Sequence, residues 1–566
     1  MTVWGWTQRR SLPATRTPAP AATAVIGAGR GGRTYPDLQH RFTARTAGSN
    51  RLVGWLGPLA VFALALAMRL WHLGQPHAVL FDETYYAKDA WSLVNFGYVR
   101  EYVDGADDKI LAGHVHGIFT DQPAEVVHPE VGKWMIGAGE WLFGMNPTGW
   151  RVSAAVFGAL TILVLARLVR RLSGSTLIGC LAGLLLTFDG LHFVLSRLAL
   201  LDVFLAFWLV CAVACLVADR DYGRARLAER CAAGRDISGF GPVRTLLWRP
   251  WRLGAGVCFG LACGTKWSGV YVLAAFGLLM LAWDIGARRA IGVRSAWLKS
   301  VIIDGLPGFL MLVGVALVVY VLTWTGWLVH HGTYEARYGH GYGDIAPWGS
   351  YLDHPAHGWF DATVSALRSL WHYHAMVYDF HTGSYLASQT HPYMSQPLGW
   401  LTLNRPVGIA VTNGIAPGAQ GCAAPAGSDC IRQVLALGNP VLWWAAVPAL
   451  VLSLWQWLVR RDWRFAVPIV AVGASWLPWF RYDDRPIFLF YATAIIPFSC
   501  AALAMVCGVV LGPADAARKR RLAGLGLIVA LVTGVVICFA FFYPIWSDAL
   551  LTHTQWQSRM WFNRWI

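Results

Sequence analysis

The sequence predicts an all-α integral membrane protein with about eleven membrane-spanning helices, and three observations indicate this fold class. Apolar residues make up 56% of the 566-residue chain and charged residues only 14%, whereas soluble domains hold about 25% charged residues. The chain contains 31 Trp residues, a residue type that prefers the membrane–water interface. Basic residues recur in short stretches between apolar segments, as in cytoplasmic loops. Membrane topology therefore explains the net charge of +15, and no nucleic-acid partner is predicted.

The apolar segments have the length and spacing of helices that cross a bilayer. A span needs about 20 mostly apolar residues. The expected spans lie near 52–71, 150–169, 175–193, 198–218, 253–265, 269–284, 306–328, 440–458, 464–480, 487–511 and 523–543. If the N-terminus is cytoplasmic, every loop on that side carries an excess of Arg or Lys.

The same topology assigns a place to the remaining segments. Residues 1–50 have no apolar stripe and are expected to form a disordered cytoplasmic tail. An odd number of spans places residues 546–566 outside the cell as a C-terminal tail. Two long loops, about 72–149 and 329–439, also face outward.

Each outward loop contains one segment with apolar residues at helical spacing. One segment follows Asp82 and the other covers 360–380. We expect both to be helices that lie in the membrane interface. Cys422 and Cys430 are the only Cys pair in an outward loop, and an oxidising compartment favours a disulfide between them.

Two adjacent carboxylates, Asp82 and Glu83, directly follow the first span in the motif FDETYY. One of them could act as a general base that removes the proton from an acceptor hydroxyl. The alternative is structural, because Asp is favoured at helix N-caps and acidic side chains suit the positive end of the helix dipole.

Further polar residues lie at the outer ends of the other spans. Basic groups there could bind a lipid phosphate, or they could simply extend to water along the membrane surface. Arg197 and Asp202 could instead form an ion pair that holds the bundle together. The other candidate site residues are His128, Lys133, Arg151, Lys266, His391, Tyr393 and Arg485.

These residues all belong to the predicted outer surface, and polar groups gathered at one membrane depth indicate a functional site. A transporter would instead carry polar residues near mid-membrane. The sequence has no Walker A motif for a nucleotide. Asp82, Glu83 and a nearby His could hold a divalent cation, but neither a metal nor another cofactor is predicted.

Over residues 52–545 the chain resembles the protein O-mannosyltransferases of the bacterial, actinomycete type. The resemblance rests on the order and spacing of several motifs, namely FDE, HPEVGKW, SRLALLD, GLACGTKWSG, THPYMSQPLGW and RPIFLFYATAIIPF. It implies that residues 51–545 form a GT-C type transmembrane catalytic domain. It further implies inverting transfer of mannose from polyprenyl-phosphate mannose to Ser or Thr hydroxyls of secreted or membrane proteins, at the outer face of the plasma membrane.

The resemblance also suggests roles for individual residues. Asp82 would be the general base, and Glu83 would position the acceptor or order the site. The donor phosphate would meet Arg151, Lys266, Arg197 and Arg485. The chain departs from its eukaryotic relatives in having no large MIR domain in the second outward loop, and its second motif reads HPEVGK rather than HPPxGK.

The predicted partners are the lipid-linked sugar donor, protein acceptors and membrane lipids. Action on secreted chains would also suit an enzyme that works beside the protein secretion channel. The nearest alternative is another GT-C enzyme that uses a polyprenyl-phosphate sugar but transfers it to a glycolipid or a cell-wall glycan.

Overall fold

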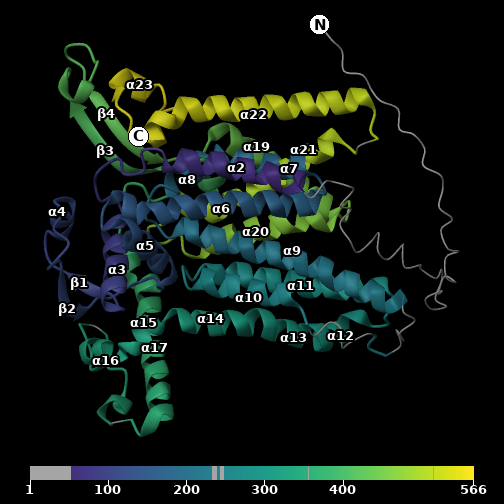
Figure 1. Ribbon diagram of the computed structural model, residues 1–566, viewed down its shortest axis with the longest axis horizontal. Coiled ribbons are helices and arrows are strands. Elements are labelled where there is room, and N and C mark those ends of the chain that lie inside the picture. Colours follow the sequence, from purple (N-terminus) through teal and green to yellow (C-terminus); the bar gives the residue numbers. More distant parts are fainter. Residues whose placement is uncertain (1–51, 233–238, 242–247, 344, 355, 514) are drawn as a thin grey trace.

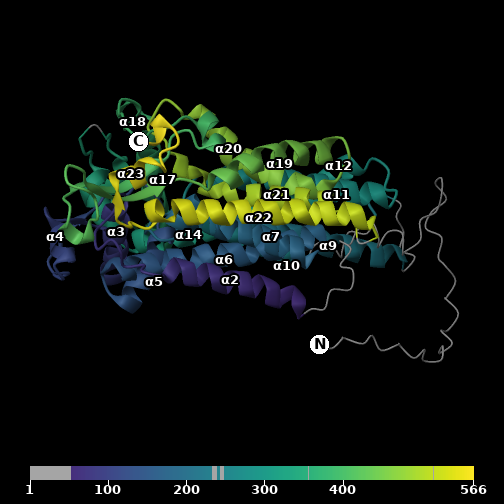
Figure 2. The same ribbon diagram turned by 90° about the horizontal axis from the view of Figure 1, so that it is seen from above.

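The computed structural model describes residues 52–232, 239–241, 248–343, 345–354, 356–513 and 515–566. The predicted tail 1–50 lies outside these residues. Most of the described chain is helical, and the long helices lie side by side in one bundle (Figure 1). The same parallel arrangement is visible from above (Figure 2).

Seven helices in the described part of the chain are long and apolar enough to cross a membrane. Six of them are single helices, and the seventh, Ala296–Thr323, consists of α12 (Ala296–Ser300), α13 (Leu306–Phe309) and α14 (Val315–Thr323), joined by π-helical turns. The six are α2 (Val53–Leu70), α6 (Pro147–Ser173), α9 (Asp202–Ala232), α11 (Gly269–Ala290), α19 (Pro440–Leu458) and α22 (Arg518–Trp546).

Shorter helices occupy the other four predicted spans. They are α7 (Thr176–Thr187) with α8 (Gly190–Leu195), α10 (Pro250–Cys263), α20 (Ala466–Trp476) and α21 (Ile496–Leu511). Every predicted range therefore contains a helix, while the count of eleven spans stays a prediction.

Local sequence explains where the helices begin and end. The Asn146 side chain accepts hydrogen bonds from the backbone N–H groups of Thr148 and Gly149, and Pro147 occupies the first helical position of α6. Asn at the N-cap and Pro at the first position are both typical helix starts. Gly174, with a φ of 71°, ends α6 in the left-handed conformation that glycine adopts without a steric penalty.

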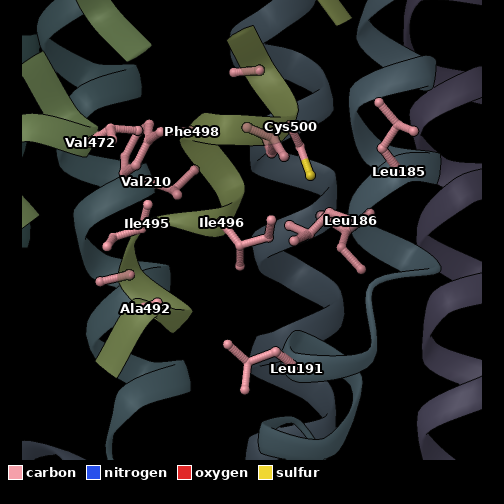
Figure 3. Packing of buried hydrophobic residues seen from close by; sticks show 14 of the residues in the cluster. Leu185, Leu186, Leu191, Val210, Val472, Ala492, Ile495, Ile496, Phe498 and Cys500 are labelled. Atoms are coloured by element: carbon pink, nitrogen blue, oxygen red, sulfur yellow. The ribbon is translucent and has the colours of Figure 1, made fainter. Parts of the chain in front are cut away.

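The core lies where the short helices meet the long ones (Figure 3). Leu185 and Leu186 of α7, Val210 of α9, and Ile496 and Phe498 of α21 belong to one buried cluster. Most side chains of α21 are buried on every side of the helix. A short helix that is apolar all round suits this central position.

One end of the bundle carries nearly all of the irregular structure (Figure 1). The helices there are α3 (Glu83–Phe96), α4 (Ala106–Leu111), α5 (Val131–Phe143), α15 (Thr325–Val329), α16 (His331–Tyr334), α17 (Gly358–Thr382), α18 (Ser384–Ala387) and α23 (His553–Gln557). The segments predicted to face outward therefore share one end of the molecule.

The same end contains two small antiparallel sheets, so the prediction of an all-α fold was wrong in this detail. One sheet pairs β1 (Arg100–Tyr102) with β2 (Phe119–Pro123). The other has the order β3-β4-β5, built from β3 (Val407–Ile415), β4 (Cys430–Ala436) and β5 (Leu551–Thr552). Strands this short give little periodic signal, and β5 pairs with a strand far away in the sequence.

The second sheet also fixes the C-terminal segment, which is not a free tail. The Trp565 ring is 2% exposed, and its Nε1 donates to the backbone oxygen of Leu403 over 2.8 Å. Cys422 and Cys430, the pair singled out in the sequence, are joined by a disulfide at the β3–β4 hairpin.

The two helices predicted to lie in the interface differ in their surroundings. The apolar side chains of α3, including Tyr86, Ala90 and Leu93, are buried within the protein. Tyr85 of α3 remains exposed, and the interfacial position of α3 stays a prediction. By contrast, α17 keeps Phe360 and Trp371 exposed and runs across the direction of the long helices (Figure 1).

Candidate active site

A cavity of about 510 Å³ opens near the irregular end of the bundle. It lies between the α10–α11 turn, α11, α14, the end of α17 and the segment 478–491. One wall is apolar and comes mainly from Val270, Leu273, Val313, Ala316 and Leu317. The other wall carries polar and aromatic side chains, namely His128, Lys266, Trp267, Tyr271, Tyr320, Tyr378, His381, Tyr482, Arg485 and Tyr491.

Lys266 lies in the turn between α10 and α11, as predicted from the sequence. Its Nζ is 2.9 Å from both carboxylate oxygens of Asp202, the first residue of α9. Burial alone would lower the pKa of Lys266, but Asp202, Tyr491 and Asp82 together outweigh burial, and the pKa lies above its usual value. Lys266 is therefore a permanent positive charge at the polar wall of the cavity.

Asp82 lies close to this pair, at the N-cap position of α3. It therefore occupies the N-cap position that the structural alternative predicted, but its side chain makes no capping hydrogen bond. Burial raises the pKa of Asp82 to about 6, the positive charge of Lys266 opposes the rise, and Asp202 adds to it. A carboxyl group with a pKa near neutrality suits a general base.

The turn that presents Asp82 has an unusual backbone. Phe81 has a φ of 49°, a value uncommon for a residue other than glycine. Its ring contacts those of His391, Phe488 and Phe490, with centroids 6.2, 6.1 and 5.8 Å away. Such conformations persist where packing fixes them and cluster at functional sites. His391 thus supports the turn, and Tyr393 lies next to it, at 5.8 Å between centroids.

Glu83 points away from the cavity into a fully buried ion pair with Arg151. The guanidinium Nε and Nη2 of Arg151 each lie 2.8 Å from a Glu83 carboxylate oxygen, and both side chains are 0% exposed. The remaining Arg151 N–H groups donate to backbone oxygens of Leu73, Pro76 and Ala78. Because its five N–H groups are all engaged, Arg151 has none left for a donor phosphate in this geometry.

Arg197 is also engaged in holding the structure. Its guanidinium donates to the backbone oxygens of Arg69, in the last turn of α2, and of Trp71 and His72, which follow that helix. The suggested Arg197–Asp202 ion pair was wrong, because Asp202 pairs with Lys266.

Lys133 lies on α5 and forms an ion pair with Asp89 of α3 over 3.0 Å. Its side chain is only 1% exposed. It therefore neither extends to water nor faces the cavity. The pair joins α5 to α3.

His128 lines the cavity, where its ring stacks on that of His381 with centroids 5.3 Å apart. Burial and the nearby Lys266 charge hold the pKa of His128 well below its usual value. Burial also lowers the pKa of His381 to about 4. Both rings are therefore neutral at pH 7, and the positive charge of the cavity comes from Lys266 and Arg485.

Arg485 differs from the other arginines of the site. Its Nη1 lies 3.3 Å from Nδ1 of His381, and its buried Nε has no hydrogen-bond partner in the described part of the chain. No ion pair among the described residues includes Arg485. Arg485 is therefore a cation beside the cavity, with an N–H group that could still donate a hydrogen bond.

Sequence reasoning missed several residues of this wall, above all His381, Tyr491 and Trp267. The segment 360–380 was recognised as a helix, but α17 extends to Thr382 and so includes His381. The sequence signal for His381 was its position in the last turn of a helix that borders a polar loop. Tyr491 and Trp267 look like ordinary core aromatics in the sequence.

The described residues do not bring Asp82, Glu83 and a His together as a site that could hold a divalent cation. Both Glu83 oxygens accept hydrogen bonds from Arg151 and from the backbone N–H groups of Leu80 and Ala199. Within the described ranges, no three His, Cys, Asp or Glu side chains gather in a way that could hold a metal ion.

Comparison with known proteins identifies the family. The family model described as dolichyl-phosphate-mannose-protein mannosyltransferase matches residues 59–334, and the model for the C-terminal four-transmembrane region of protein O-mannosyltransferase matches residues 366–565. The chain belongs to this family. It is a multi-pass membrane glycosyltransferase, and Asp82, Lys266 and Arg485 all lie within the matched ranges.

Individual relatives agree with this assignment. The polyprenol-phosphate-mannose–protein mannosyltransferase of Mycobacterium tuberculosis is 37% identical over 523 residues, covering 91% of this chain and 92% of the relative. The Corynebacterium glutamicum protein of the same name is 32% identical, covering 86% and 88%.

A solved structure supports the fold. The Saccharomyces cerevisiae protein O-mannosyltransferase Pmt1–Pmt2 complex bound to the sugar donor matches with a TM-score of 0.65 at 13% identity, covering 97% of each chain. This likeness shows the fold alone, a helical bundle of the GT-C type.

Proposed function

We propose that this enzyme transfers mannose, with inversion, from polyprenyl-phosphate mannose to Ser or Thr hydroxyls of secreted or membrane proteins. The relatives that cover most of the chain are named for this donor and for protein acceptors. The reaction takes place at the outer face of the plasma membrane.

The observation that carries the proposal is the make-up of the cavity. A polyprenyl-phosphate sugar has an apolar chain, an anionic phosphate and a polar sugar. The apolar wall between α11 and α14 suits the lipid chain, and Lys266 and Arg485 supply two cations for the phosphate. Asp82 lies close to Lys266, where it can meet an acceptor hydroxyl beside the sugar.

These residues account for an inverting displacement in one step. Asp82 accepts the proton of the Ser or Thr hydroxyl while the hydroxyl oxygen attacks the anomeric carbon. The bond between that carbon and the phosphate oxygen breaks, and polyprenyl phosphate leaves with the bonding electrons. Lys266 and Arg485 stabilise the negative charge that develops on the phosphate.

Arg151 and Glu83 act indirectly in this mechanism. Their buried ion pair joins α6 to the first residue of α3, next to Asp82. Arg197 secures the preceding loop. These residues order the site rather than contact the donor.

The membrane orientation belongs to the same proposal. Eleven spans and a cytoplasmic N-terminus place the cavity, both sheets and the C-terminal segment outside, where secreted chains emerge from the secretion channel. The exposed residues Phe360, Val364, Leu367, Trp371 and Tyr378 recur at helical spacing on α17. This strip would lie in the outer membrane interface.

The proposal is tested with membranes that contain the protein, labelled polyprenyl-phosphate mannose and a Ser/Thr-rich peptide. Label on the peptide with the parent chain, but not with Asp82→Asn, is the expected result. Label on a membrane glycolipid instead would keep the donor class and refute the protein acceptor. No label on any acceptor would refute the proposed donor.

A further inference from the structure

His381 connects three segments that surround the cavity. It lies in the last turn of α17, and its Nε2 is 2.8 Å from the backbone oxygen of Val127, just before α5. Its Nδ1 is 3.3 Å from Nη1 of Arg485. Its ring stacks on His128 and meets the edge of Trp267, with centroids 5.3 and 6.1 Å apart.

The chemistry of these two contacts fixes the state of the imidazole. A carbonyl oxygen can only accept a hydrogen bond, so Nε2 of His381 must carry a proton. A guanidinium can only donate, so Nδ1 must present its lone pair to Arg485. His381 is therefore a neutral imidazole with the proton on Nε2.

Arg485 needs such a partner more than the other arginines of the site. Arg151 and Arg197 are held by several backbone carbonyls each, whereas the side chain of Arg485 has one hydrogen-bond partner among the described residues, the imidazole. Its buried Nε is left without a partner among the described residues, as expected of a donor reserved for an absent ligand. A long side chain loses considerable conformational freedom when it binds, and fixing it beforehand reduces that loss.

We propose that His381 is a positioning residue that orients the Arg485 guanidinium toward the phosphate of the lipid donor. This inference rests on the proposed function. The neutral imidazole supplies an acceptor without neutralising the cation, so Arg485 keeps its full charge for the phosphate. A carboxylate at this position would compete with the donor.

The test compares three variants of the full-length protein in membranes. His381→Phe keeps an aromatic ring against His128 and Trp267 but removes both hydrogen bonds. His381→Gln can still donate to Val127 and accept from Arg485. His372→Phe is the matched control, because His372 lies on the same helix but stacks on Trp348 and Tyr351 outside the cavity.

We expect His381→Phe to raise the KM for polyprenyl-phosphate mannose about tenfold, the usual effect of one lost hydrogen bond to a charged group. His381→Gln should recover most of this loss, and His372→Phe should match the parent. A KM for His381→Phe within twofold of the parent would overturn the proposal.

A double-mutant cycle with Arg485→Gln separates positioning from general structural damage. If His381 acts through Arg485, His381→Phe has no further effect once Arg485 is replaced. Equal effects of His381→Phe in both backgrounds would overturn the proposal. If His381→Phe does not accumulate, His381→Leu, which also lacks both hydrogen bonds, takes its place.

The two proposals fail in different ways. A parent chain that transfers no mannose from this donor refutes the proposed function, and the role of His381 falls with it. If the parent transfers mannose but the effects of His381→Phe and Arg485→Gln are additive, only the role of His381 is refuted.

Discussion

Asp82 and Glu83 are neighbours in one motif, yet the fold gives them opposite surroundings. Glu83 is 0% exposed, and its two oxygens accept four hydrogen bonds, from Arg151, Leu80 and Ala199. Asp82 makes no capping bond, and its pKa is raised to about 6 by burial. The difference teaches that a saturated carboxylate holds the structure, while its unsaturated neighbour remains free to accept a proton.

The cations of the site divide in the same way. Arg151 has all five of its N–H groups engaged, whereas Arg485 has a buried Nε without a partner in the described chain. Lys266 is intermediate, since it is paired with Asp202 but lines the cavity. In the proposed mechanism, unused hydrogen-bond donors rather than charge alone distinguish the residues that bind the donor from those that hold the structure.

The largest expected effect comes from Asp82→Asn. Loss of the general base should lower kcat by about 10²–10⁴-fold. Thermal unfolding of the purified variant should match the parent, because the Asp82 side chain makes no capping bond. Turnover is measured as label transferred to the peptide. A variant that keeps full turnover would remove Asp82 from the mechanism.

Glu83→Gln should act through stability instead. Breaking a fully buried ion pair costs about 3–5 kcal/mol, because a charge is left buried without its partner. We expect a lower unfolding midpoint in detergent, partly restored in Glu83→Gln/Arg151→Met. If Glu83→Gln unfolded like the parent but lost turnover, Glu83 would belong with Asp82 in the chemistry.

The cations give the next prediction. Arg485→Gln and Lys266→Met should each weaken donor binding about 10- to 100-fold, the range expected for lost hydrogen bonds from a charged group. Because Lys266→Met alone leaves Asp202 unpaired, it is best compared with Lys266→Met/Asp202→Asn. Arg197→Gln is the contrasting variant, which should leave the donor KM unchanged and lower the unfolding midpoint. If Arg197→Gln raised the donor KM more than Arg485→Gln or Lys266→Met did, the assignment of Arg197 to a structural role would be contradicted.

The sequence predicts the bundle better than the site. Apolar segments and Lys266 in a short turn carry local signals, so the helices and their common end could be predicted. The partner of each charge could not. Arg151 meets Glu83 across 68 residues of chain, and only the tertiary fold decides that Asp202 pairs with Lys266 rather than with Arg197.

The same reason explains the other misses. β5 pairs with β4 across more than a hundred residues, and His381 is one of several histidines on an aromatic helix. Its proposed role depends on contacts with Val127 and Arg485, which lie far away in the sequence. Patterns of residue type identify which side chains could act, but hydrogen-bond saturation is a property of the folded chain.

The smallest expected effect is a dependence on pH that distinguishes the two carboxylates once more. Because the pKa of Asp82 is about 6, kcat/KM should fall about tenfold per pH unit below pH 6, as the base becomes protonated. His381 titrates only near pH 4, and Lys266 stays charged throughout this range. The profile is measured between pH 4.5 and 8.

Stability should move in the opposite direction over the same range. A carboxyl group whose pKa is higher in the folded state binds its proton more tightly there, so its protonation between about pH 6 and 4 stabilises the fold. A loss of activity below pH 6 without a fall in the unfolding midpoint would therefore identify Asp82 as the titrating group. If kcat/KM instead fell only near pH 4, burial would not raise the pKa of the catalytic carboxylate. The proposed difference between Asp82 and Glu83 would then be refuted.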